Sequence, residues 1–130
     1  MDRKKLLKFL ELLVLFIFIV NLLANKFYWY YSVWYFDVIM HFLGGFWLGL
    51  VALYLWGVRD IRLIFKMLFF VFFLGLGWEV FEYLFNNYIA GNSFNVLDTA
   101  SDIFFDLLGG LCAILYLLVP LKNKRIGSKE

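Results

Sequence analysis

The sequence predicts an all-α, polytopic membrane protein, a single domain of residues 1–130 that folds as a four-helix transmembrane bundle. Hydrophobic residues make up 65% of the chain, and there is only one proline. A soluble domain of this length cannot bury so much apolar surface. Four apolar stretches also reach the length of about 20 helical residues that crosses a bilayer core. The composition and these stretches together predict four membrane-spanning helices.

Each predicted span is an apolar stretch with polar or basic residues at its ends. The spans are expected at residues 6–24, 37–56, 61–85 and 100–119. Pro120 is expected to stop the last one. The first span begins with basic residues, as a cleaved signal peptide does, but its apolar core is too long and Leu22–Ala24 is a poor cleavage site. We therefore expect this segment to be retained as a helix.

Basic residues predict the orientation, because loops that are rich in Lys and Arg stay in the cytoplasm. Only Lys26 falls on one side of the predicted spans, whereas eleven basic residues fall on the other. The eleven are Arg3, Lys4, Lys5, Lys8, Arg59, Arg62, Lys66, Lys122, Lys124, Arg125 and Lys129. Both termini are therefore expected in the cytoplasm, with the aromatic stretch Phe27–Phe36 as a belt at the outer interface. The net charge is only +2 and the basic clusters are short, so no nucleic-acid partner is expected.

Acidic residues and the only histidine lie inside or beside the predicted spans. An ionised carboxylate within a bilayer costs about 2.5–3.5 kcal/mol on insertion scales, so residues of this kind usually mark a function. The residues are Asp37, His41, Glu79, Glu82, Asp98, Asp102 and Asp106. Helical residues three or four positions apart share a face. In each span the acids share a face with glycines that allow helices to approach closely, so we expect these faces to meet inside the bundle.

The polar residues of three spans are also expected at one depth. At about 1.5 Å per residue, five of these residues fall within roughly 5–12 Å of the outer interface: His41, Glu79, Glu82, Asp102 and Asp106. Asn21 and Asn25, one turn apart near the outer end of the first span, are candidates to complete the ring. The glycines and the amide that share the acidic faces are Gly45, Gly49, Gly75, Asn86 and Gly110.

So many neighbouring carboxylates cannot all be ionised without a counter-charge, and the sequence offers no Lys or Arg at this depth. Protons, a cationic ligand or a metal ion are the remaining sources of positive charge. Oxygen ligands with one imidazole suit divalent Mg, Mn, Ca, Fe or Zn. The chain lacks the Glu-x-x-His motif of soluble di-iron bundles. The predicted metal ligands are His41, Glu79, Glu82, Asp102 and Asp106, with Asp37 and Asp98 nearer the rim.

The two rim acids have alternative interpretations. Asp37 is equally consistent with a residue of the membrane interface. Asp98 is equally consistent with a helix N-cap, which would place Asp102 in the first turns of the last span.

Two segments of the chain match each other at an offset of 65 residues. They are DVIMHFLGGF at residues 37–46 and DIFFDLLGGL at residues 102–111. In this alignment His41 corresponds to Asp106, and both segments are expected to run from the outside to the inside. A parallel repeat of two helical hairpins would produce this pattern. Chance similarity between two apolar helices is the alternative.

The chain resembles the YjdF-like family of bacterial inner-membrane proteins in three motifs of the last three spans. These are Asp37-x-x-x-His41-Phe42 with Gly45-Phe46, then Glu79-x-x-Glu82, and then Asp98-Thr99-x-Ser101-Asp102. It is more weakly similar to VanZ-like membrane proteins, whose Glu-x-x-Gln pattern it lacks at Glu82. The resemblance implies a multi-pass protein of the plasma (inner) membrane of a prokaryote. It carries over no activity.

Three functions fit the acidic segments. The first is a membrane protein whose divalent metal site at the outer leaflet joins helices or binds an envelope partner. The second is a metal-dependent hydrolase or transferase for a phosphate-containing lipid or envelope precursor, with Glu79 and Asp106 as candidate catalytic residues. The third is a cation or proton transporter. The lack of nearby cations disfavours phosphate chemistry, and the apolar cytoplasmic half disfavours transport unless a homo-oligomer supplies the path.

Overall fold

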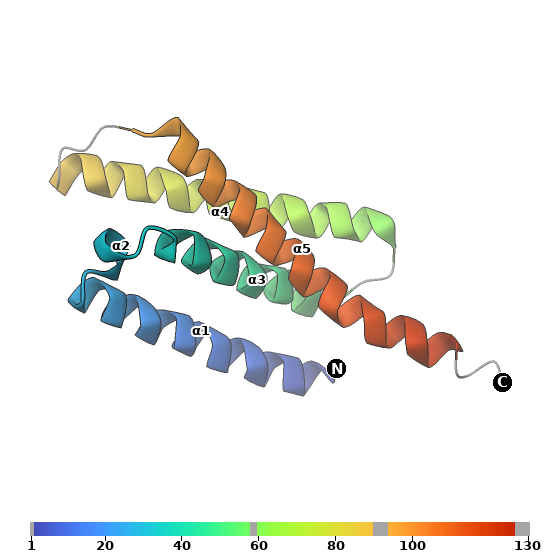
Figure 1. Ribbon diagram of the computed structural model, residues 1–130. Helices are drawn as coiled ribbons and strands as arrows, with labels where there is room; N and C mark the ends of the chain where they lie inside the picture. The colour runs from blue at the N-terminus through green and yellow to red at the C-terminus, as the bar shows by residue number, and fades with distance from the viewer. Residues whose placement is uncertain (1, 58–59, 90–93, 127–130) are drawn as a thin grey trace.

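The computed structural model describes residues 2–57, 60–89 and 94–126, with the side chains of 86–89 and 117–126 left out. This part of the chain consists of helices joined by short non-helical segments, and it contains no strand. Its five helices are α1 (Arg3–Lys26), α2 (Trp29–Ser32), α3 (Phe36–Trp56), α4 (Ile61–Ile89) and α5 (Val96–Ile126). The prediction of an all-α protein is confirmed (Figure 1).

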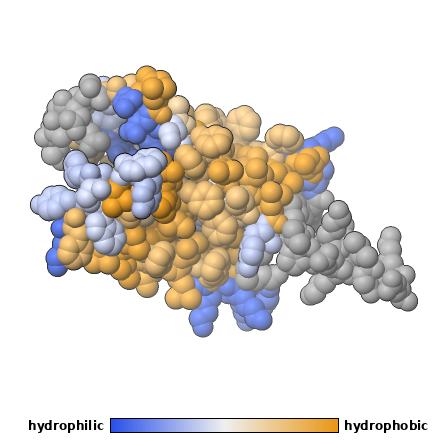
Figure 2. All heavy atoms as spheres, in the orientation of Figure 1, coloured by the Kyte–Doolittle hydropathy of each residue, from blue (hydrophilic) through white to orange (hydrophobic). Residues whose placement is uncertain are grey.

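Four of these helices are long and apolar enough to cross a membrane. The candidate spans are Arg3–Lys26, Phe36–Trp56, Ile61–Phe85 and Val96–Tyr116. They lie where the four spans were predicted, which confirms a four-helix membrane bundle. Apolar side chains cover the middle of its surface (Figure 2), as the hydrocarbon of a bilayer requires.

The ends of the last span differ from the prediction. Helix α5 begins at Val96, four residues before position 100. Asn95 is the reason, because its side-chain Oδ1 accepts hydrogen bonds from the backbone N–H groups of Leu97 and Asp98 and so caps the helix. The prediction that Pro120 stops the helix is wrong, since α5 continues to Ile126. A proline removes only one backbone hydrogen bond, and the basic residues that follow favour a helix C-terminus.

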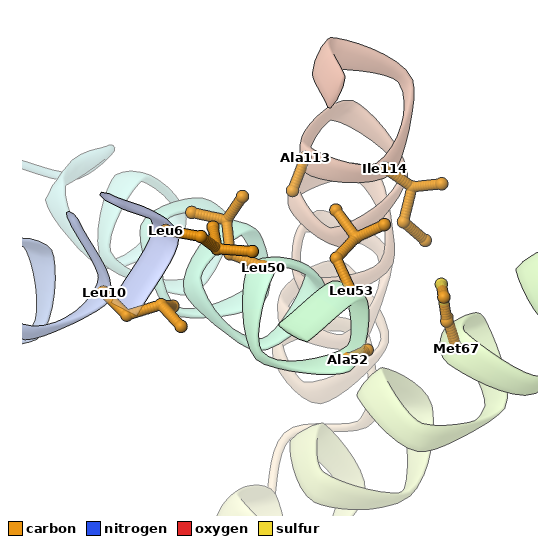
Figure 3. Close-up of a cluster of buried hydrophobic side chains, with 8 residues drawn as sticks. All are labelled: Leu6, Leu10, Leu50, Ala52, Leu53, Met67, Ala113 and Ile114. Atoms are coloured by element: carbon orange, nitrogen blue, oxygen red, sulfur yellow. The ribbon is translucent and has the colours of Figure 1, made fainter. Parts of the chain in front are cut away.

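Helix α3 is the centre of the bundle and contacts α1, α2, α4 and α5. The apolar core gathers at the end of the bundle where α1 and α4 begin and α3 ends. Its buried members, drawn in Figure 3, are Leu6, Leu10, Leu50, Ala52, Leu53, Met67, Ala113 and Ile114. The acidic residues of α3, α4 and α5 lie toward the opposite ends of the same helices. The bundle therefore has one apolar end and one end with ionisable groups.

Close backbone packing joins α3 to α5, which run side by side in the same direction (Figure 1). A Cβ atom at Gly45 would overlap the backbone carbonyl of Asp106, and one at Gly109 would overlap the carbonyl of Phe42. A Cβ at Gly49 would lie 2.7 Å from the carbonyl oxygen of Gly110. Only glycine fits at these points, as in other membrane bundles whose helices meet through small residues.

The two segments that match in sequence are neighbours in this helix pair. His41 and Asp106, which correspond at the 65-residue offset, contact each other. Among the described residues, helix α4 contacts both α3 and α5, whereas α1 contacts α3 but not α5. In a repeat of two helical hairpins, α3 would correspond to α5 and α1 to α4. The neighbouring positions of α3 and α5 fit this pattern, but α1 and α4 do not make the same contacts. The duplication therefore stays a prediction.

Helix α1 is attached through few polar contacts. The indole Nε1–H of Trp47 donates to the carbonyl oxygen of Leu10 at 3.0 Å. The guanidinium of Arg3 donates to the carbonyl oxygen of Tyr54 at 3.3 Å and lies over the Tyr54 ring. Most of the remaining α1 surface is exposed and apolar. This surface matches a helix that faces lipid on most of its sides.

The predicted orientation stays a prediction. Arg59 and Lys129, which contribute to it, lie outside the described residues, as do the side chains of Lys122, Lys124 and Arg125.

Candidate metal centre

Three helices bring six of the predicted residues together. Helix α3 supplies Asp37 and His41, α4 supplies Glu79 and Glu82, and α5 supplies Asp102 and Asp106. We call these six residues the acidic centre. In the described part of the chain, the polar or charged side chains that are buried all belong to it: His41, Glu79, Asp102 and Asp106, with exposed fractions of 6, 8, 3 and 5%.

The imidazole of His41 lies in the middle of the acidic centre, with its ring nitrogens 3.3–3.8 Å from four carboxylates. Its Nε2 atom lies 3.8 Å from Asp37 Oδ1, 3.7 Å from Glu79 Oε1 and 3.8 Å from Asp102 Oδ2. These distances are too long for hydrogen bonds. Ligands that bind one ion at about 2.0–2.2 Å in a tetrahedral arrangement lie roughly 3.3–3.6 Å from one another. The spacing around Nε2 is therefore close to that of ligands around a shared cation.

The other ring nitrogen of His41 is held by Asp106. Nδ1 lies 3.3 Å from Asp106 Oδ1, within hydrogen-bond distance. A carboxylate at this position accepts a hydrogen bond from the Nδ1–H group, and the lone pair of the neutral ring is then on Nε2. The same carboxylate lies against α4, because a Cβ at Gly75 would be 2.5 Å from Asp106 Oδ2. Gly75 thus makes room for the group that orients the imidazole.

The donor atoms form two overlapping sets that share His41. One set is Asp37, His41 and Asp102, and the other is His41, Glu79 and Glu82. Within each set the candidate ligand atoms lie within 4.8 Å of one another. Because Nδ1 faces Asp106, the imidazole has one nitrogen left for an ion. A single ion at Nε2 would have two candidate carboxylates from each set, Asp37 and Asp102 from one and Glu79 and Glu82 from the other.

One buried oxygen of the acidic centre has no hydrogen bond. Glu79 Oε1 is fully buried and has no hydrogen bond. A buried polar atom without a partner costs about 1–3 kcal/mol, and more when the group is charged. A bound cation or a proton would remove this cost. The orphaned oxygen and the all-oxygen-plus-imidazole donors both fit a divalent ion.

The acidic centre also lacks a basic neighbour. Among the described residues, the ion pair that involves a Lys or Arg is Arg62 with Asp60, at 4.0 Å and at the other end of α4. The positive charge that the carboxylates need must therefore come from His41, from protons or from a bound cation.

Asp98 is not one of the candidate ligands, although its charge acts on Asp37 and Asp102 of the acidic centre. It is exposed in the first turn of α5 and belongs to neither candidate set. The N-cap interpretation of Asp98 is wrong, because Asn95 occupies that position. Asn86, which was expected on the same face as Glu79, has a side chain outside the described residues.

Asn21 and Asn25, the candidates to complete the polar ring, make hydrogen bonds outside the acidic centre. Asn25 donates to the backbone carbonyl oxygen of Asn21 in its own helix, at 2.9 Å. The Asn21 side chain instead accepts a hydrogen bond of 2.6 Å from the hydroxyl of Tyr30. Burial, then Asp37 and then Glu82, raises the pKa of Tyr30 to about 12, so this phenol lies close to the acids. Sequence reasoning missed Tyr30, since it is one of several aromatic residues in the predicted interfacial belt.

An apolar groove of about 500 Å³ lies elsewhere, between α4 and α5. It is lined by Phe65, Leu68, Phe69, Phe72, Phe104, Leu107, Leu108 and Leu111. No residue of the acidic centre lines it, so the groove does not extend that centre.

A family model matches most of the chain. Residues 2–123 match the model of a family described as predicted membrane protein (DUF2238). No curated protein and no solved structure matches the chain. The family match covers nearly all of the chain and agrees with the resemblance to uncharacterised YjdF-like membrane proteins. The chain therefore belongs to the DUF2238 family of predicted membrane proteins.

Proposed function

We propose that the protein is an integral membrane protein that holds one divalent metal ion in the acidic centre, near the outer leaflet. The ion would bind His41 Nε2, with Asp37 and Asp102 from one candidate set and Glu79 and Glu82 from the other. Asp106 would orient the imidazole from Nδ1. The observation that carries the proposal is the contrast between the two nitrogens: one faces three carboxylates at 3.7–3.8 Å, and the other faces one at 3.3 Å.

An imidazolium that simply pairs with the acids is the competing explanation. A charged N–H forms short hydrogen bonds with a carboxylate, at about 2.7–2.9 Å. Among the described residues, the carboxylates paired with Nε2 lie 3.7–3.8 Å from it, which is longer than such a bond, and Glu79 Oε1 has no hydrogen bond. A cation of larger radius than a proton accounts for both observations.

We assign the ion a structural and binding role. Its ligands come from three helices, and the apolar core lies at the opposite end of the bundle. An ion that binds only the folded state adds its binding free energy to the stability of the fold. It would therefore hold together the ends of α3, α4 and α5 that the core does not reach.

A metal-dependent enzyme for a phosphate-containing lipid or envelope precursor is the second candidate. It is favoured by Asp37, whose side chain is 32% exposed and so leaves one edge of the centre open. Transport through a single bundle is disfavoured. Leu50, Met67, Val71 and Ile114 are fully buried beyond the centre and would block a path to the cytoplasm.

Metal analysis of the protein purified in a mild detergent tests the proposal. We expect about one divalent ion per chain in the wild type, and loss of most of it in the Asp102→Asn and Glu79→Gln variants. Asp98→Asn is the matched control, because Asp98 lies one turn before Asp102 on the same helix but outside both candidate sets. A wild type with no more metal than Asp102→Asn would refute the metal centre.

The same samples separate the two roles. A chelator should lower the thermal stability of the wild type and of Asp98→Asn, and leave Asp102→Asn unchanged. Turnover of a lipid phosphate that depends on the metal would favour the enzyme instead. Metal removal without a change in stability would contradict the structural role.

The orientation and location are part of the proposal. We place both termini in the cytoplasm and the protein in the plasma (inner) membrane of a prokaryote, with the acidic centre toward the outside. The eleven basic residues on one side of the spans support this orientation. A reporter that is active only in the cytoplasm should be active when it is fused after Glu130. An inactive reporter would place the C-terminus outside and contradict the proposed orientation.

A further inference from the structure

The short helix α2 lies between the outer ends of α1 and α3 and contacts both of them (Figure 1). Tyr30 is its inward residue and is half-buried. Its ring meets Phe36 edge to face, with the ring centroids 4.9 Å apart, and Trp29 meets the same ring at 5.7 Å. Phe36 is buried and directly precedes Asp37. These aromatic rings lie at the outer edge of the acidic centre.

Tyr30 connects α2 to α1 through a hydrogen bond and also lies near two acids of the centre. Its hydroxyl donates to Asn21 Oδ1 on α1 at 2.6 Å. Its electrostatic neighbours are Asp37 of α3 and Glu82 of α4, one acid from each candidate ligand set. The phenol is thus hydrogen-bonded to α1 and lies within electrostatic range of one acid of α3 and one acid of α4.

Helix α2 is short and has little buried surface. It has four residues, and none of them is buried. Tyr28, which precedes it, has a φ of 58°, a left-handed conformation that a bulky side chain rarely adopts. Elements with little buried surface open at low free-energy cost, and strained residues often mark switching segments.

We propose that α2 is a lid over the outer mouth of the acidic centre, held shut by the hydrogen bond from Tyr30 to Asn21, and that it sets the rate at which cations enter and leave. The cation part of this inference rests on the metal site proposed above. Tyr30 acts as a positioning residue and does not bind the ion. It follows that opening the lid changes the rates of metal association and dissociation together, while the affinity stays the same.

Stopped-flow exchange of Co²⁺, followed by its visible absorption, tests the lid. Tyr30→Phe keeps the ring but removes the hydroxyl. We expect both association and release into a chelator to become about three- to tenfold faster, from the usual worth of one hydrogen bond, with Kd changed less than twofold. Tyr31→Phe is the control, since Tyr31 is the next residue and is 89% exposed. It should exchange at the wild-type rate.

Two results would overturn the lid. One is equal exchange rates in Tyr30→Phe and the wild type. The other is a faster release with an equally weakened Kd, which would make Tyr30 a contributor to the site itself.

A second measurement needs no metal. In a Cys112→Ala background, Glu82→Cys places a thiol under the proposed lid, and a membrane-impermeant maleimide reports how often it is reached. Adding Tyr30→Phe should speed labelling about three- to tenfold, and adding Tyr31→Phe should not. Failure of Co²⁺ to bind the wild type would refute the metal site, whereas unchanged labelling would refute the lid.

Discussion

A single added methyl group at Gly45 should separate α3 from α5, whereas the same change at Gly44 should be tolerated. The Cβ of an alanine at position 45 would overlap the backbone carbonyl of Asp106. At position 44 nothing lies within 4 Å of the added atom. The two neighbouring glycines therefore form a matched pair, in which only one is needed for the close approach of the helices.

The magnitude follows from two opposing contributions. Alanine is favoured over glycine inside a helix by about 1 kcal/mol, and this gain is the same at both positions. Overfilling a packed interface costs about 1–3 kcal/mol. We expect a cost of about 3 kcal/mol at position 45, because the added Cβ would meet backbone atoms of Asp106. Non-bonded carbon atoms need a separation of about 3.5 Å, and a backbone cannot rotate away as a side chain can. We expect Gly44→Ala to be about 1 kcal/mol more stable than the wild type, and Gly45→Ala to be about 3 kcal/mol less stable than Gly44→Ala.

Unfolding in mixed micelles, followed by helical circular dichroism as the denaturing detergent is increased, measures this difference. Metal content gives a second reading. A displaced α5 moves Asp106 away from His41, so Gly45→Ala should also lose metal, while Gly44→Ala should retain it. Equal unfolding free energies for the two variants would refute the close contact on which the reasoning depends.

Three further predictions concern individual side chains. Asp106→Asn should weaken metal binding about 10- to 100-fold in a chelator competition, because the loss of a group that orients a ligating histidine has effects of that size. An unchanged metal affinity would show that Asp106 does not support the ligand His41. Trp47→Phe should lower the free energy of unfolding by about 1 kcal/mol through loss of the hydrogen bond to Leu10, and an unchanged value would show that this bond does not help to hold α1. The difference in absorbance at 295 nm between wild type and Tyr30→Phe should titrate near pH 12, because burial beside Asp37 raises the pKa of this phenol to about 12. Since the folded pKa is above the usual value of 10.0, the stability linked to this proton is complete below pH 10 and is lost as the pH rises toward 12; a midpoint near 10 would place Tyr30 in solvent.

The helical phase of the sequence was sufficient to identify most of the acidic centre. Asp102 and Asp106 are four residues apart, so any helix through them places both on one face. The cost of burying a charge in lipid then makes that face point inward. The same reasoning could not separate Asp98 from these two, because it shares their spacing and differs only in lying at the exposed start of α5.

Some features had no signal in the local pattern. Tyr30 lies among aromatic residues that all suit an interface, and only the approach of α1 gives its hydroxyl a partner in Asn21. Likewise, Pro120 predicts a helix end on its own, although α5 continues beyond it.

By itself, the sequence determined that this chain is a four-helix membrane protein with a polar end and an apolar end. It could do so because span length, helical phase and the cost of charge in lipid act along one helix at a time. Only the tertiary structure decided which residues of the acidic centre face each nitrogen of His41. Which nitrogen of His41 meets Asp106, and which is left facing three other carboxylates, depends on how closely α3, α4 and α5 approach. That approach is set by Gly45 and Gly75, whose missing side chains matter only against a neighbouring helix.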